Sequence, residues 1–170
     1  SQFLPGKMDE IRFWDDVRTV SEIQENMHKD MTGSESNLVA YYKMSNGTGT
    51  SLTDNSSNSN TGTLTNMDNS DWVTSQAPIG NLGSSYKTDV EGIWKGSGTS
   101  ESDASNGLTM TVGSALSTGN FAVFGNNNTS DATTADLGSV ASTIRTARIW
   151  QVDESGTVAA AIKIDMSDAT

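Results

Sequence analysis

The chain has 170 residues, of which 34% are hydrophobic, and its formal net charge at pH 7 is −11. This charge opposes binding to nucleic acid and to anionic membranes, and no apolar run is long enough to cross a membrane. The chain lacks Cys, which excludes disulfides, thiolate zinc sites and cysteine nucleophiles. Four Trp, four Phe and three Tyr nevertheless favour packed cores over disorder. We therefore expect a folded protein with no nucleic-acid partner and no membrane insertion.

Two strands and a polar stretch are predicted in the first part of the chain. Residues 11–14 alternate with the period of a half-buried strand. Residues 37–44 are apolar at both alternating sets of positions, so this strand is expected to be covered on both faces. A turn signal follows at Asn46 and Gly47. The stretch 52–66 is almost entirely Ser, Thr, Asn, Asp and Gly, a composition that suits a linker, a metal-binding loop or a turn.

A short helix is predicted between these two strands. Thr19 and Glu22 have the spacing of a capping box, which marks the first turn of a helix. Ile23 and Met27 lie four residues apart and would share one face, and Gly33 is a suitable end. A helix of about two to three turns is not stable alone, so we expect it to lie on a sheet.

The second part of the chain has the pattern of an all-β domain. Strands are predicted at residues 108–112 and 121–124, and residues 148–164 have the pattern of a hairpin that turns at residues 154–156. Several short strands separated by turn residues indicate a sandwich or a barrel. The chain ends soon after the last of these strands, so truncation of this domain at its C-terminus remains open.

A domain boundary is predicted at Pro78, where a Gly- and Ser-containing stretch begins. We therefore divide the chain into a first domain at residues 1–77, a linker at 78–85 and a second domain at 86–170.

The residues Met-Asp-Glu-Ile-Arg-Phe-Trp at 8–14, with Glu22 and Ile23, resemble the closing strand and helix of laminin-G-like (concanavalin A-like) jelly rolls. The strand at 37–44 and the polar stretch 52–66 resemble the same family. The resemblance implies an ordered loop at 52–66 that leads into a further strand. A complete jelly roll has more strands, so the first domain is expected to be its C-terminal part. Unpaired edges beside the strands at 11–14 and 37–44 would then be completed by upstream strands of the same protein or by a neighbouring copy.

In the second part, the residues at 92–93, 124–127 and 148–156 are similar to a β-sandwich module of surface adhesins that Bacteroidota export by type IX secretion. Together the two resemblances imply an all-β fold: a partial jelly-roll sandwich with one short helix, followed by a second antiparallel β-sandwich. They also imply an extracellular, cell-surface location. The abundance of Ser, Thr, Asn and Gly favours that location over an acidic cytosolic domain.

Catalysis is not expected. Some jelly rolls of this superfamily are glucanases with paired carboxylates on one strand, but here Arg12 stands two residues after Glu10, where a second acid would be needed. His28 is the only histidine, and with no Ser or Asp constellation beside it we expect it to be solvated. The chain is therefore interpreted as a protein that is not an enzyme.

A calcium site is the one candidate for a cofactor. Asp54, Ser56, Asn58 and Asn60 repeat at every second residue, as the ligands of a calcium loop do. The stretch lacks the Gly and the final Glu that such loops place at fixed positions. Laminin-G-like domains often bind calcium at a rim, so the resemblance supports the ion, whereas the residue types favour plain turn formation.

Carbohydrate binding requires an exposed aromatic side chain beside polar hydrogen-bonding groups. The candidates are Trp14, Tyr41, Trp72 and Trp94. For each of them the alternative is packing in a core or an interface. Trp150 is assigned to the core of the second domain.

We interpret the chain as a non-catalytic adhesion or recognition module of a large bacterial cell-surface protein, with glycans or other surfaces as its partners. One alternative is a structural spacer or fibre-forming segment with no ligand, in which the Trp residues are buried. Another is an accessory carbohydrate-binding domain of a secreted polysaccharide-degrading enzyme.

Overall fold

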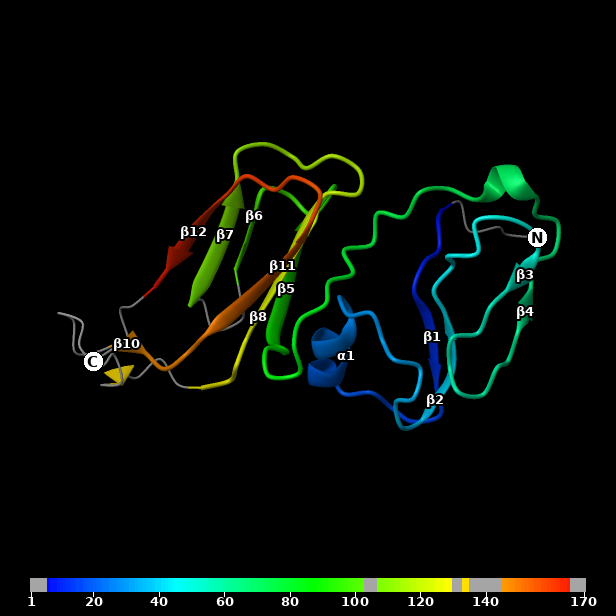
Figure 1. The fold of residues 1–170 in the computed structure, drawn as a ribbon, viewed down its shortest axis with the longest axis horizontal. Coiled ribbons are helices and arrows are strands. Elements are labelled where there is room, and N and C mark those ends of the chain that lie inside the picture. The colour runs from blue at the N-terminus through cyan, green and yellow to red at the C-terminus, as the bar shows by residue number, and fades with distance from the viewer. Residues whose placement is uncertain (1–5, 103–106, 130–132, 135–144, 166–170) are drawn as a thin grey trace. The chain divides into compact units, whose positions relative to one another are not determined.

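The structure is a computed structural model in which residues 6–102, 107–129, 133–134 and 145–165 are described. It is mostly strand, with one short α-helix, as the sequence predicts, and all pairs of named strands are antiparallel (Figure 1). The chain forms two compact units. The first contains residues 1–19 and 31–77, and the second contains residues 20–30 and 78–170. The two units are therefore not separated at one position in the sequence, because the segment 20–30 belongs to the second unit.

The first unit is built on a short antiparallel pair. Strand β1 (Ile11–Trp14) pairs with β2 (Leu38–Tyr42), and β3 (Ser51–Leu52) pairs with β4 (Gly62–Thr63). A short 3-10 helix, η1 (Asn69–Asp71), follows. The polar stretch 52–66 is therefore ordered, as expected, and it leads into β4.

The core of the first unit is small. Met31, Leu38 and Tyr41 are buried together, and Trp14 packs against them. Val39 is exposed, so the expectation that β2 is covered on both faces is wrong at this position. Tyr41, which alternation places on the same face as Val39, is buried, so this face is covered at one of the two positions only.

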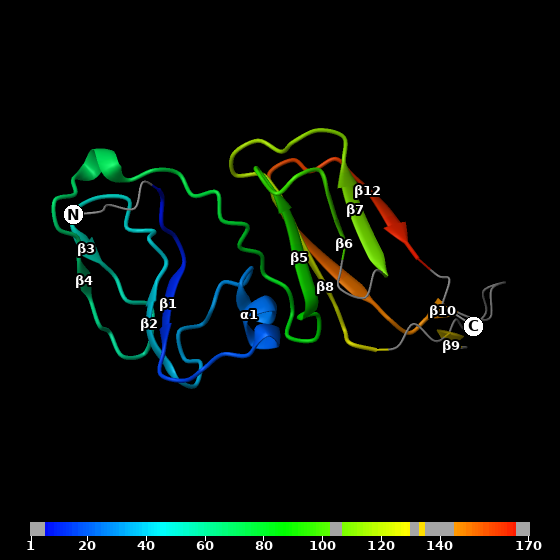
Figure 2. The same cartoon turned by 180° about the vertical axis from the view of Figure 1, so that it is seen from behind.

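The second unit is an antiparallel β-sandwich, seen as two layers in Figures 1 and 2. One sheet has the order β11 (Trp150–Ser155), β8 (Phe121–Asn126), β5 (Thr88–Trp94). The other has the order β12 (Ala160–Ile164), β7 (Leu108–Val112), β6 (Ser100–Ser102). A separate pair joins β9 (Thr133–Thr134) to β10 (Arg145–Thr146).

Both sheets contribute to one core. Its buried side chains come from β5, β7 and β8: Ile93, Leu108, Met110, Val112, Ala122 and Phe124. Trp150 packs against this cluster, as the sequence analysis assigned it. Alternation along β7 places every second residue inward, which is why this strand could be predicted from its apolar pattern.

The hairpin predicted at residues 148–164 does not form. Strand β11 pairs with β8, and β12 pairs with β7, so the chain crosses from one sheet to the other at the predicted turn. Gly156 has a φ of 72° there, and the Asn120 side chain donates to the carbonyl of Thr157 at 3.0 Å. Turn residues show where a chain reverses but not which strand it then pairs with. Here the two strands belong to different sheets of the sandwich instead of bonding to each other.

Helix α1 (Val20–Asn26) begins directly after Thr19, as the capping-box spacing predicts, but it ends well before Gly33. It packs against β5, so it does lie on a sheet. The predicted apolar face is wrong, however, because Ile23 and Met27 are both exposed. The helix is held by polar and backbone contacts at its C-terminal end, where the backbone N–H of Gly80 donates to the carbonyl of His28 at 2.8 Å.

Candidate functional site

The polar stretch 54–60 covers the edge of β2 that does not face β1. The backbone N–H of Asn55 donates to the carbonyl of Tyr41 at 2.7 Å. Further along the strand, the side-chain amides of Asn58 and Asn60 donate to the carbonyl of Val39, each at 3.0 Å. These groups occupy the positions at which a neighbouring strand would bond. The expected unpaired edge beside Tyr41 is therefore covered from within the chain.

The Asp54 carboxylate organises this stretch. Its Oδ1 accepts from the backbone N–H of Tyr41 and of Ser56, both at 2.8 Å. Its Oδ2 accepts from the Ser56 hydroxyl at 2.8 Å and from the backbone N–H of Asn60 at 2.6 Å. Burial acts to raise the pKa of Asp54, but these hydrogen bonds outweigh it, so the pKa of Asp54 lies below its usual value. The side chain thus ties the loop both to itself and to β2.

This geometry favours turn formation over ion binding at Asp54, Ser56, Asn58 and Asn60. A calcium ion takes six to eight oxygen ligands, and carboxylate oxygens are the strongest of them. Both oxygens of Asp54 already accept two hydrogen bonds each.

Calcium is accordingly expected to leave the stability of the protein unchanged. An ion that entered the loop would have to displace the backbone donors from Asp54, and this cost would offset its binding. The check is thermal unfolding in millimolar calcium, in EDTA, and in magnesium as an ion control. A calcium-specific rise in the melting temperature that Asp54→Ala abolishes would contradict the turn interpretation.

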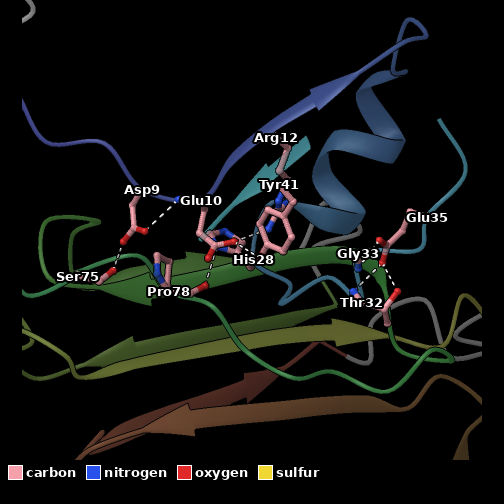
Figure 3. Close-up of polar contacts among 10 residues, drawn as sticks. All are labelled: Asp9, Glu10, Arg12, His28, Thr32, Gly33, Glu35, Tyr41, Ser75 and Pro78. Atoms are coloured by element: carbon pink, nitrogen blue, oxygen red, sulfur yellow. Dashed lines mark hydrogen bonds and ion pairs between the residues drawn. The ribbon is translucent and has the colours of Figure 1, made fainter. Parts of the chain in front are cut away.

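Tyr41 is fully buried, so it cannot form a carbohydrate platform. Its hydroxyl donates to the Glu10 carboxylate, which also accepts from Arg12 Nη2 at 2.9 Å (Figure 3). The Arg12 guanidinium lies 5.2 Å from the centre of the Tyr41 ring, in a cation–π contact. Burial raises the pKa of Tyr41, and the bond to Glu10 raises it further. The only carboxylate considered for catalysis is therefore engaged in holding β1 against β2.

The contact of Glu10 with Arg12 and Tyr41 was not predicted from the sequence. Glu10 has a φ of 52° directly before β1, and its carboxylate accepts from Arg12 Nη2, within the strand, at 2.9 Å. Tyr41 lies directly opposite Arg12 in the register of β1 and β2. Cross-strand pairs of this kind stabilise a sheet, which is a structural use of the same residue types.

The first unit holds two of the candidate Trp residues, Trp14 and Trp72. Trp14 belongs to the small core, and the Arg18 guanidinium lies 4.2 Å from the centre of its ring. Trp72 follows η1, and its indole N–H donates to the carbonyl of Gly49 at 3.0 Å. Both side chains are half-buried. One face of the Trp14 ring is therefore taken by Arg18, whereas the recorded contact of Trp72 is at the edge of its ring.

Trp94 lies in the second unit, next to a buried histidine. The ring centres of Trp94 and His28 are 5.5 Å apart. His28 is only 7% exposed, so the expectation that it is solvated is wrong. Its Nδ1 lies 3.2 Å from the carbonyl of Pro78, which orients the ring beneath α1 (Figure 3). An isolated His in a polar sequence gave no indication of this burial, because the contacts come from residues about fifty positions later.

The sequence analysis missed an aromatic pair made by the exposed Phe13 and the half-buried Tyr42. Phe13 is 54% exposed, and its ring lies 6.2 Å from that of Tyr42 at an interplanar angle of 80°. The Tyr42 hydroxyl donates to the carbonyl of Asn60 at 2.5 Å. Alternation along β1 predicted a strand but did not say which of its two faces would remain in solvent. Among the described residues of the first unit, this contact places an exposed aromatic ring, that of Phe13, at the surface.

Comparison with protein-family models, with curated proteins and with solved structures finds no match to this chain. Within the described ranges, no helix is long and apolar enough to cross a membrane.

Proposed function

We propose that this chain is a non-catalytic structural spacer in an extracellular bacterial surface protein. The proposal rests on one observation: the polar stretch 54–60 covers the edge of β2. This segment looked most like a ligand-binding loop, yet its side chains bond to the edge of β2 and to the loop itself. Such a cover protects a strand edge from association without Cys or metal. A Ser-, Thr- and Asn-rich module outside the cell fits this use.

The state of the other candidate groups supports the same proposal. Tyr41 is buried, Trp14 is covered by Arg18, and Trp94 packs beside His28. The Glu10 carboxylate is engaged by Arg12 and by Tyr41, which suits a structural role rather than acid–base chemistry. The resemblance to laminin-G-like jelly rolls and to type IX-secreted adhesins enters here as the proposed setting of the module.

The proposed setting also gives β1 a role. In the described part of the first unit β1 has one strand partner, β2. We propose that the other edge of β1 is completed by upstream strands of the same protein or by a neighbouring copy, as a jelly roll would require.

Glycan recognition is the second candidate function, and the exposed Phe13 ring beside the half-buried Tyr42 favours it. An aromatic ring beside amide and hydroxyl groups can stack on a sugar, and the Asn60 carbonyl lies against Tyr42. The module would then serve in adhesion, or as an accessory domain beside a polysaccharide-degrading enzyme.

A glycan array distinguishes the two candidates. The intact chain is expected to give no glycan-specific signal, because its aromatic candidates do not form one shared platform. The same array is probed with Phe13→Ala and with Val17→Ala, a matched control at an almost fully exposed apolar position. Binding by the intact chain and by the control, but not by Phe13→Ala, would replace the spacer proposal with glycan recognition.

A further inference from the structure

The segment 20–30 belongs to the second unit, whereas the residues on both sides of it belong to the first unit. It contains α1, which packs against β5 (Figures 1 and 2). Residues 1–77 form one continuous half of the chain, and residues 78–170 form the other half. The second unit is therefore completed by a segment from the other half of the chain. The two halves are joined covalently at one position, between residues 77 and 78.

His28 is the main anchor of this segment. Its ring centre lies 5.5 Å from that of Trp94 in β5, and its Nδ1 lies 3.2 Å from the carbonyl oxygen of Pro78. The carbonyl of His28 accepts from the backbone N–H of Gly80 at 2.8 Å. The His28 ring also lies over Gly92, since a Cβ at that position would be 3.5 Å from its Cε1. A strand position without a side chain thus leaves room for the ring on β5.

Few apolar contacts hold the segment in place. Three of its apolar side chains are exposed: Val20, Ile23 and Met27. A gap with room for about one water molecule remains between the segment and residues 80–90. Lys87 Nζ lies 3.7 Å from Glu25 Oε2, and both side chains are partly exposed. Segments with little buried apolar surface open at a low cost in free energy, so we expect this one to leave β5 without unfolding of the sandwich.

The connection between the two halves is suited to a change of direction. Residues 72–79 contain no helix or strand, and residues 73–75 are exposed. Among the described residues, every pair of named strands lies within one half of the chain. A parallel bridge between Lys29 and Gly80 joins the two halves. Rotation in the connection would therefore separate the halves without breaking a sheet.

We propose that the segment 20–30 of one copy docks on β5 of a second copy, and that the second copy returns the same contact, which gives a reciprocal, segment-exchanged dimer. The contacts of the monomer are then made between copies: His28 with Trp94, and Glu25 with Lys87. Because the contacts are the same, the balance between monomer and dimer is set by protein concentration and by the connection 72–79. This interaction is independent of the spacer function proposed above.

The surface on β5 selects a second copy as its partner. It already holds this segment within one chain, so its shape and charge fit the sequence of residues 20–30. An unrelated peptide would need an imidazole over Gly92 and a carboxylate facing Lys87 at the same spacing. The net charge of −11 makes two copies repel. At physiological ionic strength this repulsion is screened beyond about 8 Å.

The test reverses the two charges of this contact in separate full-length variants, Glu25→Lys and Lys87→Glu. Sedimentation equilibrium is measured at physiological ionic strength, after incubation until the distribution no longer changes. The native chain is expected to show a monomer–dimer equilibrium. Each variant alone is expected to dimerise like the native chain, because like charges meet both in its monomer and in its exchanged dimer.

An equimolar mixture of the two variants is expected to behave differently. One copy then carries two positive groups at this contact and the other carries two negative groups. Both contacts of a mixed, exchanged dimer therefore pair opposite charges, whereas neither monomer does. The mixture is expected to dimerise at least about tenfold more strongly than either variant alone.

Two controls change the net charge by the same amounts at exposed positions outside this contact: Asp15→Lys and Lys7→Glu. Their mixture is expected to dimerise like the native chain. Circular dichroism of each variant establishes that it is folded before the association is compared. A native chain that stays monomeric at all concentrations overturns the proposal. So does a mixture of Glu25→Lys and Lys87→Glu that dimerises no better than each variant alone, or no better than the mixed controls.

Discussion

Gly33→Ala is expected to destabilise the first unit by about 3–5 kcal/mol. Gly33 has a φ of 86°, a left-handed conformation that costs an L-residue with a side chain about 1–2 kcal/mol. A Cβ at this position would also lie 1.9 Å from the carbonyl oxygen of Asn55. That oxygen belongs to backbone, so it cannot rotate away. The carbonyl of Gly33 accepts from Ser57 at 2.8 Å, which fixes the two segments against each other.

The measurement is urea-induced unfolding followed by Trp fluorescence, with the transitions of the two units fitted separately. Gly47→Ala is the matched control. Gly47 has a φ of 70°, but a Cβ there would meet nothing within 4 Å. It is expected to cost about 1–2 kcal/mol, the torsional part alone. If Gly33→Ala and Gly47→Ala lowered the free energy of unfolding equally, the close approach of Gly33 to Asn55 would not be the cause of the destabilisation.

Asp54→Ala is expected to lower the free energy of unfolding by at least about 3 kcal/mol. The change removes the acceptor for four hydrogen bonds and leaves the N–H of the buried Tyr41 without it. Hydrogen bonds to charged groups contribute about 1.5–3 kcal/mol each, and they are not additive within one cluster. The edge of β2 would also lose the loop that covers it, so faster aggregation at high concentration is a second expected result.

The pH dependence of this loss distinguishes the carboxylate from the shape of the side chain. The pKa of Asp54 in the folded protein lies below its ordinary value of 3.8. Its contribution to stability is therefore fully present above pH 3.8 and is lost as the pH falls through the lower, folded-state pKa. The native chain and Asp54→Ala should differ in free energy of unfolding by a constant amount from pH 5 to 8. This difference should shrink in acid, over the pH range in which carboxylates become protonated.

Asp68→Ala serves as the control for these acid titrations. Asp68 also has a pKa lowered by hydrogen bonds, from the Ser70 hydroxyl and backbone, but it is fully exposed at the start of η1. Its removal is expected to have a small effect at every pH, because exposed hydrogen bonds compete with water. If Asp68→Ala matched Asp54→Ala in size and pH dependence, the cover on β2 would not be the source of the effect.

The sequence alone determined the elements that depend on local periodicity and local capping. The alternation at 11–14 and 108–112 predicted β1 and β7, because successive side chains of a strand point to opposite faces. The short apolar run at 121–124, followed by an Asn turn, predicted β8. The start of α1 after Thr19 followed from the capping-box spacing. The composition of the polar stretch 52–66 suited a linker, a metal-binding loop or a turn, and only the resemblance to laminin-G-like jelly rolls implied an ordered loop there.

Which partner each element takes was decided only by the tertiary structure. The turn near Gly156 was visible in the sequence, but the assignment of β11 and β12 to different sheets depends on β8 and β7, which lie far away along the chain. His28 is buried by Pro78 and Trp94, and no pattern around position 28 reports those contacts. Interactions between residues close in sequence set the local conformation. Strand pairing and burial depend instead on packing against residues that are distant in the sequence.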